Sequence, residues 1–350
     1  MTNPSLTNEV RACRERRDWT QEDLSQRTGL SRPEISAIET GRLVPSTSAA
    51  LALARAFGCA VECIFHLPHA VIDDQPQWAW EPSQLPARFW ASQLHGGLRL
   101  IPVEPGELGQ IPHDGVWDGK EIRMQPEASA TAARTLVLAT CDPAVGLLAA
   151  ELARTENIRL IALRRSSHEA LHLLDAGLVH GAGAHLMGDT AEHPKFASAP
   201  VVRMAEWEEG VVLRSPPPAG GLSRALRDVR RWVWREPGSG ARQCQDLVLE
   251  GKVEPRHTVD SHGAVVEAVR SSWADAGIAL RLSSAQAGLA FLSVRTEPYD
   301  MHMAPDFADD FRFAVFLRVV RSKRFRALLA ELPGYSTSHT GEVRKERRAS

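Results

Sequence analysis

From residue 135 onward, short apolar runs alternate with amphipathic stretches, and no other feature of the sequence limits the fold so strongly. The runs at 135–139 and 158–163 have the length and composition of buried strands, and each is followed by a polar turn and a helical pattern. A third strand is expected at 178–183. Because strands that alternate with helices form mostly parallel sheets, this part of the sequence predicts an α/β fold.

The same kind of pattern continues toward the C-terminus. It predicts strands at 201–202, 210–213, 232–234 and 275–279, helices at 241–249 and 261–269, and two further helices within 307–332. Since 350 residues exceed what one hydrophobic core usually holds, and since these elements suffice for two lobes, we expect a two-lobed α/β domain. The charged residues at 344–350 are expected to form a solvated tail.

Residues 6–66 carry a different pattern, in which apolar residues recur three and four positions apart, as in a small all-helical bundle. Thr20 and Ser31 are each followed by residues typical of a first helical turn, and Pro33 is tolerated only in such a turn. Gly29 supplies a tight turn between the two helices, so the sequence predicts a helix-turn-helix. The apolar positions of this pattern are Val10, Leu24, Leu30, Ile35, Ile38, Leu51, Leu53, Ala54 and Phe57.

The segment WTQEDLSQRTGLSRPEISAIETGRLVPS and its continuation LALARAFGCAVECIF closely resemble the DNA-binding domain of the Cro and phage-repressor (Xre) regulators. The resemblance implies that the second helix of the motif enters the major groove of double-stranded DNA, with its N-terminal residues on base edges. Arg32 is the main candidate for sequence recognition, because a guanidinium can bond guanine O6 and N7 together. The implied base-edge positions are Arg32, Ser36 and Ala37, and the implied phosphate positions are Gln21, Ser31, Thr40 and Arg42.

The charge of this first domain does not by itself favour DNA as its partner. Residues 1–68 contain eight arginines, no lysine and eight acidic residues. Pro33 departs from the usual polar residue and cannot read a base by hydrogen bonding. A helical bundle that contacts another protein is therefore an alternative, although the register of the motif favours DNA.

Between residues 69 and 133 the periodicity weakens, and Pro, Gly and Trp accumulate. A flexible linker does not carry four tryptophans, so we expect a structured connector with a short strand at 98–103. Its aromatic side chains are expected to pack between the domains, although they could also line a ligand pocket.

Three turns of the later domain lie between a predicted strand and a predicted helix, where free N–H groups and the helix dipole bind anions. These turns are at 141–143, 164–167 and 235–242. The third contains two glycines whose N–H groups can converge on an oxyanion, beside a serine hydroxyl and an arginine charge. The candidate ligand-binding residues are Cys141, Asp142, Arg164, Ser166, Ser167, Gly238, Ser239, Gly240 and Arg242.

Several separated elements from about residue 135 to 343 resemble the periplasmic-binding-protein-like domain that is found fused to helix-turn-helix regulators and to molybdopterin-biosynthesis proteins. They include CDPAVGLLA, HEALHLLDAGLVHGAGAHL, WEEGVVL, REPGSGARQ and LPGYSTSHTGEV. The resemblance implies a small ligand held in the cleft between two lobes by serine hydroxyls and helix N-terminal amides, with molybdate or tungstate as the first expectation. An organic anion paired with Arg164 and Arg165 is the alternative.

The segment HEALH, from His168 to His172, matches a pattern in which two histidines bind zinc and Glu169 acts as a base. Glu192 could supply a third ligand. Because the segment follows a strand at a capped helix start and carries leucines for a core face, we expect a packing helix rather than a zinc peptidase. His180 and His185 are likewise expected to be hydrogen-bonded packing residues, with contact to the cleft left open.

The five cysteines are few, odd in number and scattered, so we expect reduced thiols. Cys59 and Cys63 could share a helical face, but two thiols without further ligands do not form a closed zinc site, and we expect neither a metal nor a cofactor. No stretch approaches the roughly 20 apolar residues of a membrane span. The N-terminus lacks the apolar run of a signal peptide, so we expect a cytoplasmic protein.

Together these expectations describe a multi-domain chain. It has an all-α helix-turn-helix bundle at 1–68, a connector at 69–133, a two-lobed α/β periplasmic-binding-protein-like domain at 134–343 and a tail at 344–350. We expect a one-component transcription regulator and not an enzyme, which binds a DNA operator as a homodimer and senses a small anion through lobe closure. A zinc metallohydrolase tethered to DNA is the competing function outside regulators.

Overall fold

The computed structural model divides the chain into two compact units, Met1–Gln75 and Pro76–Ser350. The structure describes residues 6–59, 61, 64–66, 77–104, 108, 110–185, 199–215, 221–250 and 256–345. In the described part of the chain, no helix combines the length and apolarity needed to cross a membrane.

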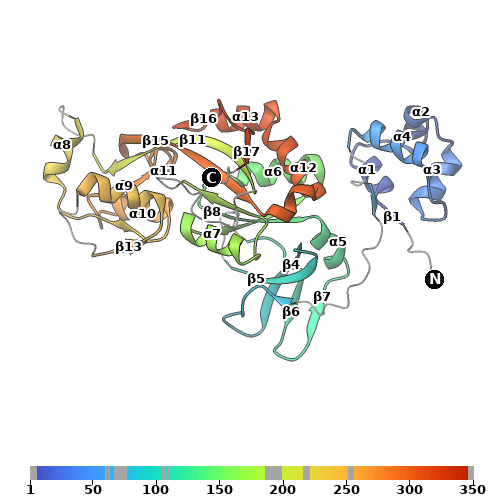
Figure 1. Cartoon of the computed structure of the whole chain (residues 1–350), viewed down its shortest axis with the longest axis horizontal. Coiled ribbons are helices and arrows are strands. Elements are labelled where there is room, and N and C mark those ends of the chain that lie inside the picture. The colour runs from blue at the N-terminus through green and yellow to red at the C-terminus, as the bar shows by residue number, and fades with distance from the viewer. Residues whose placement is uncertain are drawn as a thin grey trace, which may run out of the picture. The chain divides into compact units, whose positions relative to one another are not determined.

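The first unit contains the predicted helical bundle (Figure 1). Its helices are α1 (Val10–Glu15), α2 (Gln21–Thr28), α3 (Arg32–Glu39) and α4 (Thr47–Phe57), and the strands β1 (Thr7–Asn8) and β2 (Phe65–His66) form a small antiparallel pair. The sequence did not predict this strand pair, because two-residue strands leave no periodicity to detect.

Local capping explains where the helix-turn-helix begins and turns. Thr20 accepts a hydrogen bond from the Asp23 N–H in a capping box at the start of α2. Ser31 caps α3 by accepting from the Glu34 N–H. Gly29 ends α2 in the left-handed region at φ 74°, which a residue with a side chain rarely adopts. These local interactions confirm the predicted helix-turn-helix.

The core of this unit follows the predicted apolar spacing with one exception. Leu24, Ile35, Ile38 and Leu53 are fully buried. Leu51, which was expected in the core, is instead 56% exposed. The buried face of α4 consists of Ala49, Ala50, Leu53, Ala54 and Phe57, and position 51 lies outside this three- and four-residue spacing.

The second unit begins with a five-stranded sheet where a connector was expected. Its order is β3-β5-β4-β6-β7, formed by β3 (Gln77–Trp78), β4 (Ala87–Leu94), β5 (Gly97–Pro102), β6 (Gly115–Trp117) and β7 (Ile122–Met124). Helix α5 (Ala128–Ala133) lies against β4. Trp78 contacts Phe89 and Trp117 within this sheet, so these aromatic side chains pack among themselves.

The larger sheet has the strand order β14-β11-β15-β10-β8-β9. Its strands are β8 (Thr135–Thr140), β9 (Arg159–Arg164), β10 (Gly181–Ala184), β11 (Pro200–Leu213), β14 (Ala276–Leu280) and β15 (Ala290–Met303), and β16 (Tyr335–Ser336) and β17 (Val343–Lys345) also pair with β11. Strand β8 runs parallel to β9 and β10, as predicted, whereas β11, β14 and β15 pair antiparallel.

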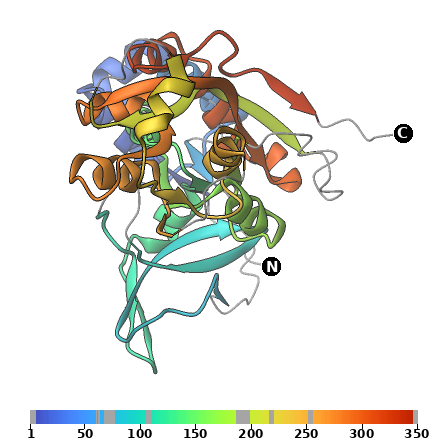
Figure 2. The same ribbon diagram turned by 90° about the vertical axis from the view of Figure 1, so that its left-hand side faces the viewer.

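Two long strands join the two halves of this unit. β11 and β15 run side by side in both views, and the small sheet, coloured cyan, lies to one side of them (Figures 1 and 2). One end of β15 pairs with β10, and the opposite end of the two-strand ribbon pairs with β14. The sequence predicted two short strands within β11 and did not predict β15, because polar residues interrupt the apolar pattern of both.

Helices then define two lobes at the two ends of the long strands. The first lobe contains β8, β9 and β10 with α6 (Val145–Glu156), α7 (Ser167–Asp175), α12 (Phe311–Val320) and α13 (Lys323–Ala330). The second lobe contains α8 (Gly221–Ala225), β12 (Trp234–Arg235), α9 (Gly240–Leu249), β13 (Thr258–Val259), α10 (His262–Arg270), β14 and α11 (Arg281–Gln286). The predicted two-lobed α/β domain is therefore present.

Candidate functional site

The helix-turn-helix exposes the side chain expected to read DNA bases. Arg32 begins α3 and is exposed, and none of the described residues bonds or pairs with its guanidinium. Ser36 and Ala37 lie further along α3 and are half-buried. A free guanidinium at the start of the second helix has the chemistry required for a guanine edge.

The residues assigned to phosphates have different local roles. Gln21 donates from its amide to Glu39 at 2.9 Å. The Thr40 hydroxyl donates to the Ser36 carbonyl at 2.8 Å and accepts from Arg42 Nε at 2.9 Å. The Ser31 hydroxyl is used in capping α3, while Arg42 is exposed. Arg42 is therefore the member of this group that offers an exposed positive charge.

Glu39 holds the motif together, a role that sequence reasoning missed. Its carboxylate accepts from Arg14 at 2.6 and 3.2 Å and also from Gln21, so one side chain joins α1, α2 and α3. The hydrogen bond to Glu39 raises the pKa of Arg14 above its ordinary value. The available sequence signal was an acidic residue at the C-terminal end of a helix, where the helix dipole disfavours a negative charge.

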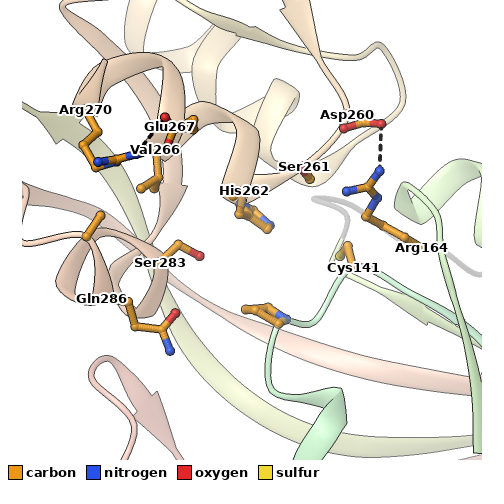
Figure 3. Close-up of a pocket in the computed structure, with 13 residues that line it drawn as sticks. Cys141, Arg164, Asp260, Ser261, His262, Val266, Glu267, Arg270, Ser283 and Gln286 are labelled. Atoms are coloured by element: carbon orange, nitrogen blue, oxygen red, sulfur yellow. Dashed lines mark hydrogen bonds and ion pairs between the residues drawn. The ribbon is translucent and has the colours of Figure 1, made fainter. Parts of the chain in front are cut away.

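A cavity of about 620 Å³ lies between the lobes of the second unit (Figure 3). Cys141, which follows β8, and Arg164, at the end of β9, come from the first lobe. The second lobe contributes residues of α10 and α11 and the loop before α10. These second-lobe residues are Asp260, Ser261, His262, Gly263, Val266, Glu267, Arg270, Ser283, Gln286 and Ala287.

The charged side chains of this cavity are paired. Arg164 lies 3.3 Å from Asp260 across the two lobes, and Arg270 lies 2.8 Å from Glu267 (Figure 3). The cavity also receives the start of α10, whose first N–H groups have no acceptor within the helix. A Cβ added at Gly263 would have no described atom within 4 Å, so the start of α10 faces open space. This arrangement can bind an anion.

The first predicted turn contributes Cys141 to the cavity but not Asp142. The Asp142 carboxylate is buried and accepts from the Tyr335 hydroxyl at 2.6 Å and from the Ala144 N–H at 2.9 Å. Burial raises the pKa of Asp142 despite these donors. Asp142 therefore joins the C-terminal strand β16 to the loop after β8.

The second predicted turn contributes Arg164 only. Arg165 pairs with Glu104 at 2.8 Å. The Ser166 hydroxyl forms a capping box with Glu169 at the start of α7. The Ser167 hydroxyl is fully buried and accepts from the His185 N–H at 3.3 Å. These two hydroxyls order the chain around the cavity and are not among its lining residues.

The third predicted turn also lies outside the cavity lining. Ser239 donates to the Glu236 carbonyl and caps α9 by accepting from the Arg242 N–H. The Arg242 guanidinium pairs with Asp246 at 2.9 Å and lies over the Trp234 ring. The glycines of the turn allow close packing, since a Cβ at Gly238 would overlap His168 and a Cβ at Gly240 would overlap His185.

The HEALH segment lies in α7, whose apolar residues Ala170, Leu171 and Leu174 are buried. The Glu169 carboxylate, which would be the base of a zinc peptidase, accepts a hydrogen bond from the Ser166 N–H at 3.2 Å and so takes part in capping the helix. Among the residues that the structure describes, no group of three metal-ligating side chains includes His168 or His172. Glu192, the expected third ligand, lies outside the described residues, as does Cys63.

His180 and His185 are both buried and hydrogen-bonded, as predicted. His180 accepts from the Val137 N–H at 3.0 Å and donates to the Gln93 carbonyl at 2.9 Å. His185 donates from Nδ1 to Glu297 at 2.6 Å. Burial would lower the pKa of His185, but the neighbouring Cys141 sulfur and the Glu297 carboxylate hold that pKa well above its usual value.

Two regulators are similar to the first unit. An uncharacterized HTH-type transcriptional regulator of Methanocaldococcus jannaschii is 40% identical over 60 residues, which are 17% of this chain and 91% of the relative. A second, from Bacillus subtilis, is 37% identical over 62 residues, which are 18% of this chain and 94% of the relative. This chain belongs to the helix-turn-helix transcriptional regulators. A helix-turn-helix domain model matches residues 5–62 of the regulator.

The second unit of this regulator contains a PBP superfamily domain, whose family model matches residues 149–321. An ABC-type phosphate transport receptor from Vibrio cholerae has a TM-score of 0.43 and 12% identity, over 57% of this chain and 98% of the receptor. A tungstate ABC transporter structure from Geobacter sulfurreducens has a TM-score of 0.43 and 15% identity, over 56% of this chain and 98% of that one. Phosphate and tungstate are named here as properties of those two proteins and not of this chain.

Proposed function

We propose that this regulator is a one-component sensor, in which a small anion bound by the PBP superfamily domain changes the affinity of the helix-turn-helix for its operator. The observation that carries the proposal is the cavity between the lobes, to which both lobes contribute residues. A ligand that contacts two lobes binds the closed arrangement better than an open one, and only such unequal binding can shift the two states.

The chemistry of the cavity favours an anion. The start of α10 faces it with Ser261, His262 and Gly263, and the guanidinium of Arg164 lies opposite. Molybdate or tungstate is the first proposed ligand. A small organic anion is the second, because a volume of about 620 Å³ is within the range of cavities that hold organic molecules.

A thermal-shift series on the full chain tests this proposal. The ligands are molybdate, tungstate, sulfate, phosphate and a panel of small organic acids, and saturation at 100 times the dissociation constant stabilises by about 2.7 kcal/mol. A shift with the metal oxyanions supports the first ligand class, and a shift only with organic acids supports the second. If none of these anions shifts the unfolding temperature, the anion-sensing proposal is wrong.

Gly263 offers a matched pair of variants for the same experiment. Gly263→Asp places a negative charge in the cavity, yet an acidic residue in the first turn of α10 is compatible with the helix dipole. Gly263→Asn has nearly the same shape without the charge. We expect the anion-dependent shift to disappear in Gly263→Asp and to persist in Gly263→Asn.

We also propose that the regulator binds a palindromic operator as a homodimer in the cytoplasm and that the cavity binds its ligand without transforming it. Helix-turn-helix proteins commonly read two half-sites one helical turn apart. Footprinting with and without the anion measures the half-site spacing and shows whether the anion strengthens or weakens binding to the operator. Recovery of chemically unchanged ligand after prolonged incubation tests the absence of catalysis.

A further inference from the structure

We propose that Cys141, His185 and His262 form a binding site for one zinc ion at the wall of the cavity. The Cys141 sulfur and one ring nitrogen from each histidine lie within 4.8 Å of one another. All three residues are buried, with exposed fractions of 8%, 2% and 3%. This inference goes beyond anion sensing, since the site requires neither an anion nor DNA.

His185 is oriented as a metal ligand. Its Nδ1 donates to Glu297 at 2.6 Å, which leaves Nε2 available for a metal. Glu297 is fixed in turn by the Trp207 indole N–H at 3.0 Å and by Arg295 at 2.6 Å. A carboxylate that holds the second ring nitrogen is the usual support of a zinc-bound histidine.

His262 supplies a second, independent observation. Its Nε2 is buried, and none of the described residues provides it with a hydrogen-bond partner. Arg235 donates to Nδ1 at 3.2 Å, so in this arrangement the hydrogen is on Nε2. Zinc on Nε2 moves that hydrogen to Nδ1 and breaks this long contact, while Arg235 keeps its two bonds to Glu236 at 3.0 and 2.9 Å.

The donor set and its dimensions fit zinc. A sulfur and two imidazoles suit zinc rather than magnesium or calcium, which prefer oxygen ligands. Zinc lies about 2.3 Å from sulfur and about 2.0 Å from nitrogen, so tetrahedral ligand atoms are about 3.5 Å apart. Because the three atoms lie within 4.8 Å of one another, no pair has to approach by more than about 1.3 Å to reach these separations.

The positions of the three ligands have two consequences for the protein. Cys141 and His185 belong to the first lobe and His262 begins α10 of the second, so zinc would join the lobes. Cys141 and His262 also line the cavity, so an ion that they hold would lie beside the space where a ligand would bind (Figure 3). Three protein ligands and an open position are typical of zinc sites that bind an exogenous group.

Metal binding by the full chain tests the site directly. The protein is treated with a chelator, incubated with zinc, desalted and analysed for metal, and a parallel sample is titrated with cobalt(II), whose thiolate bond absorbs in the near ultraviolet. We expect one metal per chain. Cys141→Ser should abolish the cobalt–thiolate band, and His262→Gln should weaken zinc binding at least tenfold.

Cys59→Ser is the matched control, because it removes a half-buried thiol from the first unit. It should keep both the stoichiometry and the absorption band. The proposal is overturned if the parent chain retains no zinc, or if Cys141→Ser and His262→Gln bind metal as the parent does. Circular dichroism of the metal-free variants establishes folding, and His262→Gln provides the test if Cys141→Ser does not fold. None of the candidate anions is added, so the result is independent of the proposed function.

Discussion

The guanidinium of Arg159 donates to both carboxylate oxygens of Asp114, at 2.7 and 2.6 Å. Arg159 begins β9 of the large sheet, whereas Asp114 directly precedes β6 of the small sheet. The Asp114 side chain is only 7% exposed and also accepts from the Ala91 N–H at 2.6 Å. This ion pair therefore fastens the small sheet to the large sheet within the second unit.

Replacing Asp114 by Ala should therefore destabilise the second unit. The change leaves Arg159 without its buried partner, and such losses cost about 3 kcal/mol. Urea unfolding of the full chain measures the effect. Glu267→Ala is the control, because its pair with Arg270 is exposed and should contribute well under about 1 kcal/mol. Equal losses in the two variants would contradict a structural role for the Asp114 pair.

The first unit contains a comparable interaction in Glu39. Glu39→Gln keeps the shape of the side chain but removes the carboxylate that Arg14 bonds directly, leaving Glu15 at 3.7 Å as its nearest acid, and we expect a loss of up to about 3 kcal/mol in that unit. Calorimetry of the full chain should show a lower transition temperature for the first unit and little change for the second. Glu22→Gln, at an exposed position of α2, should change neither transition by more than a degree or two.

The helix-turn-helix could be predicted because its determinants are local. Thr20 with Asp23 and Ser31 with Glu34 are each separated by three residues, so the sequence displays both caps. The pairing of β11 with β15 is different, because the two strands are distant in sequence and carry polar residues at their centre. Periodicity cannot reveal an element whose burial depends on such a distant partner.

The candidate site was also predicted only in part, because some of its residues follow local patterns and others meet only through the packing of distant segments. Cys141 and Arg164 follow strands of a parallel sheet, where sequence reasoning expects a site, and both line the cavity. Ser239 also follows a strand, but its hydroxyl is used in a local cap, which the same sequence spacing permits. The meeting of His185 and His262 depends on how the two lobes pack, so no local pattern reveals it.

Sequence recognition by α3 should depend on Arg32. Arg32→Ala is expected to weaken operator binding by about 1–3 kcal/mol and to relax specificity at one base pair, because the guanidinium is free to bond a guanine edge. Arg42→Ala should instead weaken binding to all sequences and reduce the slope of binding against salt by about 1. Fluorescence anisotropy with operator and scrambled DNA at several salt concentrations separates the two effects.

Arg55→Ala is the control for these DNA measurements. Arg55 is exposed on α4, outside the helix-turn-helix, and its loss removes one positive charge from the same unit. We expect its specificity to match that of the parent chain. If Arg32→Ala and Arg55→Ala weaken operator binding equally and leave specificity intact, Arg32 does not read a base.

Two glycines in the first turns of neighbouring helices should respond oppositely to the same substitution. A Cβ at Gly240 would overlap the backbone oxygen and ring of His185, and overpacking of this kind costs about 1–3 kcal/mol. Gly263 is the second residue of α10 and lies beside open space, so Gly263→Ala should be neutral or stabilise by less than about 1 kcal/mol. Thermal unfolding of Gly240→Ala and Gly263→Ala gives the comparison, and similar melting temperatures would contradict it.

His180 should make the stability of the second unit depend on pH. Burial, and then the charge of Arg312, hold the pKa of His180 well below its ordinary value of 6.5, so the folded protein keeps the ring neutral. The unfolded chain binds a proton as the pH falls below about 6.5. This contribution to stability is therefore present above pH 6.5 and is lost on acidification, by at most about 1.4 kcal/mol per pH unit.

His180→Gln removes this source of pH dependence. Its stability at pH 7 should be lower, because the hydrogen bonds to Val137 and Gln93 are changed, but it should decline less between pH 7 and pH 5.5. Urea unfolding at several pH values measures the two slopes. His185 and His262 titrate in both proteins, so the difference between the slopes isolates His180. Parallel curves for the parent and the variant would show that His180 is not held neutral in the folded chain.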